Sequence, residues 1–193
     1  IPLRLVGSEM CIRDRVIIMH ILKHLHTINK HRRLVRKYCF KLGIPWQGMI
    51  HDLSKYSFVE FFNGAKYYQG TRSPNDRERE VKGYSEAWMH HKGRNKHHYE
   101  YWIDVNNETR EYEAKEIPIK YLKEMLADRI AASRVYKGKD YTDAAPYDYF
   151  VTHMAIRNMN PKSIEIMKDW LLYLKLHGEK ETIKYIKKNY PHK

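Results

Sequence analysis

The chain has 193 residues, of which 42% are hydrophobic and 31% charged, proportions typical of a folded globular protein and not of a disordered one. It carries 36 Lys and Arg against 23 Asp and Glu, so its formal net charge is +13 and favours polyanionic partners. It has only two cysteines and no apolar run long enough to cross a bilayer, which excludes a disulfide scaffold and a membrane-spanning protein.

The first fifteen residues, "IPLRLVGSEMCIRDR", resemble a translated sequencing adapter, and we expect residues 1–15 to be a non-native segment. We then expect the natural start at Met19 or upstream of the sequence that this segment replaces. Outside this segment one cysteine remains, Cys39, on the apolar stripe of a predicted helix, where a core role is usual. A lone cysteine forms no internal disulfide, so we expect a cytoplasmic protein.

Helical patterns dominate the chain. The apolar residues Ile21, Ile28, Val35 and Leu42 recur every seven positions, which predicts one long helix over 16–42 that ends at Gly43. A short helix should follow over 46–53, and the capping-box spacing of Ser57 and Glu60 predicts another over 58–68.

The polar segment 70–83 contains Pro and Gly and is predicted to be a loop, while 106–116 gives no clear pattern. Further helices are predicted over 84–91, from about 97, and over 118–136, 161–178 and 179–189. No alternating pattern of useful length indicates a strand. The sequence therefore predicts an all-α protein with a single domain over 16–193.

The stretch most informative about chemistry is "IHDLSK", residues 50–55. Neighbouring helical positions diverge by about 100°, so adjacent His51 and Asp52 reach one ion only at the edge of a helix. Followed by Leu-Ser-Lys, the pair resembles the HD-domain signature. This resemblance implies an HD-domain-like helical bundle and a metal-dependent phosphohydrolase or, in a minority of the superfamily, a di-iron oxygenase.

The resemblance also implies a histidine from an earlier helix. His24 and His31 share the apolar face of the first predicted helix, where a histidine is usually a satisfied core residue. We choose His31 as the ligand because it is nearer the end that leads to His51, and His24 stays an alternative.

An aspartate from a later helix completes the implied site. Asp128, within "EMLADRIAAS", lies on an apolar helical face, where a carboxylate is costly to bury unless it is paired or bound to a metal. We expect it to be a metal ligand; a salt bridge to Arg129 or Arg134 is the structural alternative.

The segment "MHHKGRNKHHYEYW", residues 89–102, places four histidines between His90 and His98. Together with "HDLSK" and "MLADR" it resembles an uncharacterised phage and bacterial family in which His90 is replaceable. Some HD subfamilies bind a second metal with extra histidines in this interval. The resemblance implies His91 and His98 as ligands, with His97 as the alternative to His98.

The expected chemistry gives the remaining polar residues their roles. A metal lowers the pKa of bound water, and a phosphoryl group needs cations on its oxygens. We predict Asp52, Lys55 and Arg94 as catalytic residues and Lys55, Arg94 and Asn95 as substrate contacts. The cofactor should be one or two ions of Mn, Fe, Co, Ni or Zn.

The predicted reaction is hydrolysis of a nucleotide or another phosphorylated small molecule, in a metal-site core over about 24–136, with C-terminal helices over 146–190. Two alternatives stay open. The same ligands suit an HD-type di-iron oxygenase. A non-enzymatic, basic helical nucleic-acid-binding protein would also fit the charge, although its basic residues are spread along the whole chain. No membrane partner is expected, and the sequence predicts no oligomeric state.

Overall fold

A computed structural model describes residues 3–153 and 158–191, with side chains from residue 19 onward. The protein is mainly α-helical, which confirms the predicted class. The helices are, in chain order, α1 (Leu3–Lys41), α2 (Pro45–Ile50), the 3₁₀ helix η1 (Leu53–Tyr56), α3 (Phe58–Lys66), α4 (Pro74–Lys82), α5 (Glu86–Lys92), the 3₁₀ helix η2 (Tyr99–Trp102), α6 (Ile119–Lys137), the 3₁₀ helix η3 (Gly138–Asp140), α7 (Ala145–Thr152) and α8 (Pro161–Asn189).

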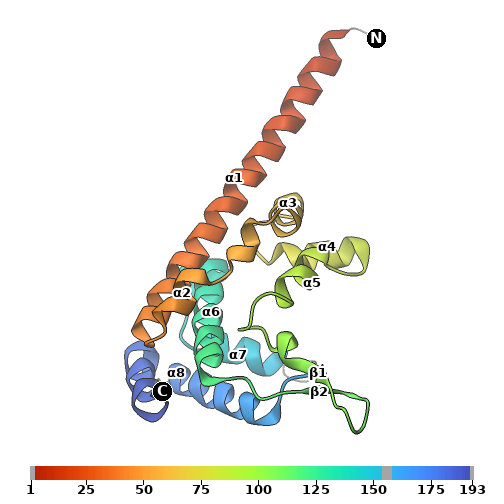
Figure 1. The fold of residues 1–193 in the computed structure, drawn as a ribbon. Helices are drawn as coiled ribbons and strands as arrows, with labels where there is room; N and C mark the ends of the chain where they lie inside the picture. Colours follow the sequence, from red (N-terminus) through yellow and green to blue (C-terminus); the bar gives the residue numbers. More distant parts are fainter. Residues whose placement is uncertain (1–2, 154–157, 192–193) are drawn as a thin grey trace.

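Helix α1 begins at Leu3, earlier than the predicted start at residue 16, and so includes most of the segment expected to be non-native. Residues 1 and 2 of that segment lie outside the described residues. The N-terminal part of α1 extends beyond the rest of the molecule (Figure 1). The helix ends where predicted, because Gly43 adopts a positive φ of 78°.

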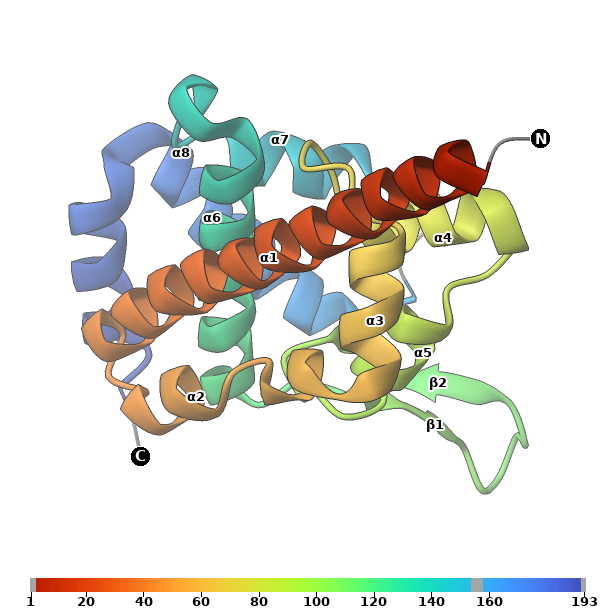
Figure 2. The same cartoon turned by 90° about the horizontal axis from the view of Figure 1, so that it is seen from above.

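The hydrophobic core lies where α1, α6, α7 and α8 meet. Val35, Leu126, Phe150 and Trp170 are each at most 1% exposed and belong to one packed cluster. Cys39 is fully buried in the same cluster, as its predicted core role requires. In Figure 2, α1 lies across α6. Burying each large apolar side chain stabilises such a core by about 1.5–3 kcal/mol.

Helices α3, α4 and α5 pack against one another, and α3 also packs against α1. The predicted cap at the start of α3 is present, since the Ser57 side chain accepts a hydrogen bond from the Glu60 backbone N–H. The loop predicted over 70–83 is wrong, because it contains α4. This helix has polar rather than apolar support: the buried Glu78 accepts hydrogen bonds from the Ser85 hydroxyl at 2.7 Å and from Lys82 at 2.9 Å.

A small antiparallel hairpin follows η2, with strands β1 (Ile103–Val105) and β2 (Tyr112–Ala114). Ile103 pairs with Ala114 and Val105 with Tyr112. The sequence predicted no strand here, because three residues are too few to show an alternating pattern. The short helix predicted from about residue 97 is η2, which begins at Tyr99.

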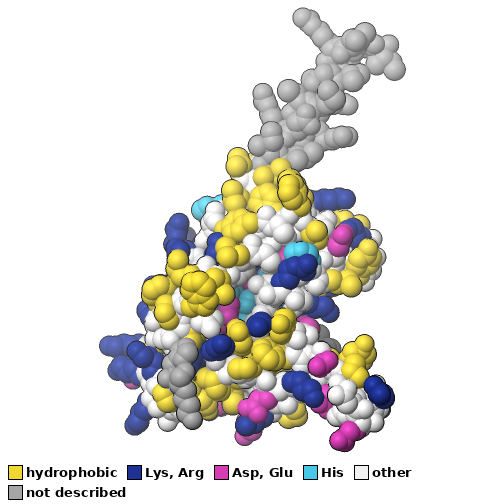
Figure 3. Space-filling model, viewed as in Figure 1, with side chains coloured by type: hydrophobic (Ala, Val, Ile, Leu, Met, Phe, Trp, Pro, Cys, Tyr) yellow, Lys and Arg dark blue, Asp and Glu magenta, His cyan; other side chains and the backbone are white. Residues whose placement is uncertain are grey.

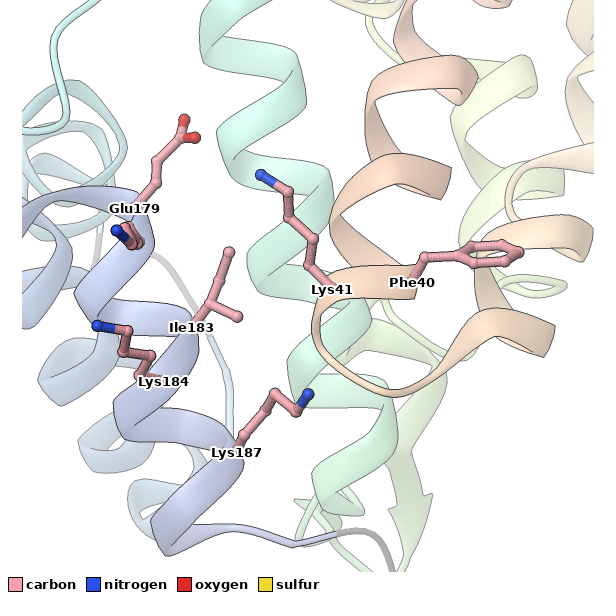
Figure 4. A pocket seen from close by; sticks show the side chains of 7 residues that line it. Phe40, Lys41, Glu179, Ile183, Lys184 and Lys187 are labelled. Carbon is pink, nitrogen blue, oxygen red and sulfur yellow. The ribbon is translucent and has the colours of Figure 1, made fainter.

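Helix α8 bends at Gly178, where the sequence predicted one helix to end and another to begin. Gly178 has φ 74° and ψ 173°, a backbone region that is almost restricted to glycine. The bend places the second half of α8 beside the C-terminal end of α1 (Figure 4). Within the two described ranges, no helix combines the length and the apolar character needed to cross a membrane.

Candidate metal centre

Asp52 lies at the middle of a buried cluster of histidines and carboxylates. It sits between α2 and η1 with φ 53° and ψ 29°, so its backbone is left-handed, and the residue is 1% exposed. Aspartate tolerates this conformation better than most residues, but the conformation still has a cost. The two oxygens of its carboxylate face two different groups of side chains.

The first group faces Oδ2 and combines α1, the end of α2 and α6. The Nε2 atoms of His31 and His51 lie 3.7 Å and 3.3 Å from Asp52 Oδ2 and 3.4 Å from each other. Asp128 Oδ1 lies 3.0 Å from His31 Nε2 and 3.7 Å from His51 Nε2. The structure thus brings together the four residues that the HD-type resemblance implied.

The second group faces Oδ1 and comes from α5 and the segment before η2. The Nε2 atoms of His91 and His97 lie 3.3 Å and 3.5 Å from Asp52 Oδ1. His98 joins them, with each residue offering a ligand atom within 4.8 Å of the others. Both His97 and His98 therefore belong to the cluster, whereas the sequence analysis predicted them as alternatives.

These distances fit metal ligands better than hydrogen bonds. Two ligands about 2.1 Å from one ion, at an angle of 90–110°, lie about 3.0–3.4 Å apart. Asp52 Oδ1, His97 Nε2 and His98 Nε2 are also buried without a hydrogen-bond partner anywhere in the described part of the chain. Such atoms are costly to bury unless something binds them. The donor set therefore fits one or two divalent transition-metal ions.

Glu124 contacts two of these histidines at Nδ1, the ring nitrogen that does not face Asp52. Its Oε1 lies 2.9 Å from His51 Nδ1 and 3.1 Å from His97 Nδ1. With Nδ1 of each imidazole held by this carboxylate, Nε2 is the ring nitrogen that faces Asp52, and it is the atom that a metal ion would bind in place of a proton. Glu124 could itself be counted as a ligand with His51 and His97, but the atoms that it contacts face away from the shared carboxylate.

Glu60 plays a similar role for the second group. Its Oε2 lies 2.7 Å from His91 Nδ1, and its Oε1 lies 2.6 Å from His90 Nδ1. Asn95 Nδ2 donates hydrogen bonds to the His91 carbonyl and to Ser54 Oγ, both at 2.8 Å. Asn95 therefore holds the α5 end of this group in place.

The carboxylates of the cluster remain ionised. Burial alone would raise the pKa of Asp52, but the positive charges of His51, Lys55 and His91 hold it well below its usual value. Burial likewise opposes ionisation of Asp128 and Glu124, yet hydrogen bonds from histidines lower the pKa of both groups. Burial lowers the pKa of His98 strongly, which keeps this imidazole neutral and able to bind a cation.

The two predicted cationic residues, Lys55 and Arg94, differ in their position relative to the cluster. Lys55 Nζ lies 2.7 Å from Asp52 Oδ2, and its side chain is 31% exposed, so it connects the buried carboxylate with solvent. The structure does not bring Arg94 into the cluster: its side chain is exposed and donates to the His90 carbonyl.

His24, the alternative to His31, lies elsewhere on α1. Its ring packs against Phe61 and Tyr68, and a Cβ added at Gly64 would come within 2.3 Å of His24 Nε2. Gly64 thus allows α3 to approach this imidazole closely. His24 is a buried packing residue, and His31 is the histidine of α1 that reaches Asp52.

The cluster is open to solvent on one side. The Asp128 side chain is 20% exposed, whereas that of Asp52 is 1% exposed. Figure 3 shows histidine and acidic side chains together near the middle of one face of the molecule. Solvent therefore reaches Asp128 and Lys55 but not Asp52.

Sequence reasoning did not single out Glu60 and Glu124. Glu124 precedes Asp128 by four residues, so it lies on the same helical face, and this spacing was an available signal. The sequence pattern around Glu60 predicts only a capping-box residue, and it does not indicate a contact between this carboxylate and the histidines of α5.

A comparison with known protein families gives one match, to a family of unknown function (DUF5662), over residues 20–172. No curated protein and no solved structure matches the chain. The match covers well over half of the chain and includes every residue of the cluster, and it begins after the segment expected to be non-native. The protein therefore belongs to the DUF5662 family of unknown function.

Proposed function

We propose that this protein is a metal-dependent phosphohydrolase of HD type that acts on a nucleotide or another phosphorylated small molecule. The observation that carries the proposal is the Asp52 carboxylate, whose two oxygens each face a separate group of histidines. A carboxylate shared in this way suits a pair of divalent ions. Ions in such a site supply Lewis acidity, which lowers the pKa of water and polarises a phosphoryl oxygen.

The chain's own residues have distinct tasks in this proposal. Asp52 stays ionised and would supply the negative charge that two cations share, one at each oxygen. Lys55, partly exposed beside Asp52, supplies a positive charge for the phosphoryl oxygens. Glu124 and Glu60 keep the imidazoles in the orientation that presents Nε2 inward.

The test begins with the metal content of the purified protein, measured by inductively coupled plasma mass spectrometry. We expect one or two equivalents of Mn, Fe, Co, Ni or Zn, and phosphate release from members of a panel of nucleotides and sugar phosphates. Asp52→Ala should abolish both, whereas Lys55→Met should keep the metal and raise KM for the phosphorylated substrate. His24→Leu is the matched control, because His24 is a buried histidine of α1 outside the cluster.

A protein that binds no metal and whose phosphatase activity survives Asp52→Ala would overturn the proposal. The histidine-rich donor set also suits a di-iron oxygenase. Iron content with oxygen consumption, and no phosphate release from any substrate in the panel, would replace the hydrolase proposal with that function.

A further inference from the structure

A groove of about 510 Å³ lies between the C-terminal end of α1 and the second half of α8. Four lysines line it: Lys41 from α1, and Lys180, Lys184 and Lys187 from α8. Figure 4 shows Lys41 and Lys187 extending into the space between the two helices from opposite sides. The bend of α8 at Gly178 places the three lysines of α8 beside α1.

A second hollow, of about 320 Å³, adjoins the groove on α1 and is lined by Arg33, Arg36, Lys37 and Phe40. Phe40 lines both hollows and is 54% exposed. In Figure 4 its ring points away from α8, so it lies on the ridge between them. The two hollows therefore form one basic surface with an exposed aromatic ring at its middle, which we call the α1–α8 groove.

This surface is separate from the metal centre. On α1, His31 and Val35 are buried, whereas Arg33, Arg36 and Phe40 are exposed. At about 3.6 residues per turn, these two sets point to opposite sides of the helix. Whatever binds in the α1–α8 groove does not have to enter the catalytic cluster.

Acidic side chains do not cancel the charge of the groove. Glu179 also lines it, but this carboxylate already accepts hydrogen bonds from the Tyr38 hydroxyl at 2.7 Å and from Arg134 Nε at 2.9 Å. Glu181 pairs with Lys184 at 2.8 Å, and both side chains are about half exposed, so this ion pair is weak. The groove keeps a net positive charge that an anion would neutralise.

A buried lysine lies close enough to the groove for the charge of Lys187 to act on it. Lys123 is 2% exposed and donates to the Tyr190 carbonyl. Burial, and then the positive charge of Lys187, lowers its pKa. Seven of the 36 Lys and Arg residues of the chain line the two hollows, from segments that are far apart in the sequence.

We propose that the α1–α8 groove binds single-stranded nucleic acid, with its cations on the phosphates and Phe40 stacked on a base. Lys180, Lys184 and Lys187 follow one face of α8 over about 10 Å, a row that can track a phosphate backbone. An exposed aromatic ring between cationic hollows is the combination that holds a single strand without reading its sequence. An acidic protein would use the charge but leave the ring without a base. The inference does not depend on the proposed hydrolase function.

The test measures fluorescence anisotropy of a fluorescein-labelled 12-nucleotide oligothymidylate with the full chain, in EDTA, over a series of salt concentrations. Binding should weaken steeply with salt. The triple variant Lys180→Gln, Lys184→Gln, Lys187→Gln should bind at least tenfold more weakly and lower the salt slope by about two, at about 0.7 per phosphate contact. The control variant Lys137→Gln, Lys139→Gln, Lys168→Gln has the same charge change at exposed positions outside the groove and should bind like the wild type.

The role of the ring is tested separately. Phe40→Leu should weaken binding several-fold, whereas Phe58→Leu, at a ring that is 82% exposed on α3, should not. Equal losses in the two triple variants would overturn the proposal in favour of diffuse charge. So would a polyglutamate of equal charge that binds as tightly as the oligonucleotide, or a duplex that binds more tightly and is unaffected by Phe40→Leu.

Discussion

Glu124 lies one turn before Asp128 on α6, and its Oε1 contacts Nδ1 of both His51 and His97. These two histidines belong to different groups around Asp52, so one carboxylate orients a ligand of each. Glu60, in contrast, contacts His91 and the neighbouring His90 and serves the second group alone. The two glutamates therefore form a natural pair for comparison.

We expect Glu124→Gln to weaken both metal-binding steps by about 10–100-fold, because it removes the charge that fixes both imidazoles. Glu60→Gln should weaken only one step and leave close to one tightly bound ion. Isothermal titration of the metal-free protein with Mn²⁺ measures both steps. A Glu124→Gln protein that loses only one ion, with unchanged circular dichroism, would contradict the shared role.

His24 gives a pH dependence that can be separated from that of the cluster. Burial, and then the positive charge of Lys55, lowers the pKa of His24 to about 4. Since the unfolded imidazole has a pKa near 6.5, the unfolded state binds the proton more readily as the pH falls from about 6.5 toward 4. The contribution of neutral His24 to the free energy of unfolding is fully present above about pH 6.5 and is lost as the pH falls toward about 4.

The free energy of unfolding should therefore fall by about 2 kcal/mol more between pH 7 and pH 5 in the wild type than in His24→Leu. Urea denaturation in EDTA at the two pH values measures this difference, because the other histidines titrate in both proteins. Parallel pH profiles for the two proteins would show that His24 is not a buried neutral group.

At the scale of the element, the bend in α8 depends on Gly178. Its φ of 74° and ψ of 173° suit only glycine, and an added Cβ would lie 3.3 Å from Asp143 Oδ2. We expect Gly178→Ala to reduce the free energy of unfolding by about 1–3 kcal/mol. Gly83→Ala is the control: Gly83 has φ 82° and ψ −13° with no atom near its Cβ position, so the cost should be only about 1 kcal/mol.

Chemical denaturation measures the free energy of unfolding of both variants. Gly178→Ala should also weaken binding in the α1–α8 groove, because the second half of α8 would shift, whereas Gly83→Ala should leave it unchanged. Equal stability losses in the two variants would mean that the bend stores no particular strain.

The helices that the sequence predicted well are those with an apolar stripe or a marked end. α1 follows its sevenfold repeat to Gly43, and α8 follows the Asn160–Pro161 start and the break at Gly178. Helix α4 was missed because its stability comes from Ser73, which caps it, and from the buried carboxylate of Glu78. A polar helix of this kind looks like a loop until its partners are known.

The candidate site shows the same division. His51 and Asp52 were visible because they are adjacent, and the resemblance to HD domains led from them to His31 and Asp128. The choice of His31 over His24 needed the structure, because both share one helical face. Glu124 shares a helical face with Asp128, and that spacing is a local signal. The contact of Glu60 with His91 joins elements that are distant in sequence, and no local pattern reports it.

At the scale of the whole molecule, the cluster concentrates ionised carboxylates in the interior of a protein whose net charge is +13. A divalent ion that binds only the folded state stabilises it by about 2.7 kcal/mol at a hundred times its Kd. For a chain of this length we expect Mn²⁺ or Zn²⁺ to raise the Tm of the metal-free protein by about 5–10 °C. Differential scanning fluorimetry with and without EDTA measures the shift, and Asp52→Ala should remove it.

The two sides of the Asp52 carboxylate belong to different parts of the chain. Oδ2 faces α1 and α6, which build the core, while Oδ1 faces α5 and the segment before η2. The segment from α3 to α5 packs against that core through α3. An ion on the Oδ1 side would therefore act as a removable cross-link, fastening an outlying piece of chain to the interior much as a disulfide does in proteins with more cysteines.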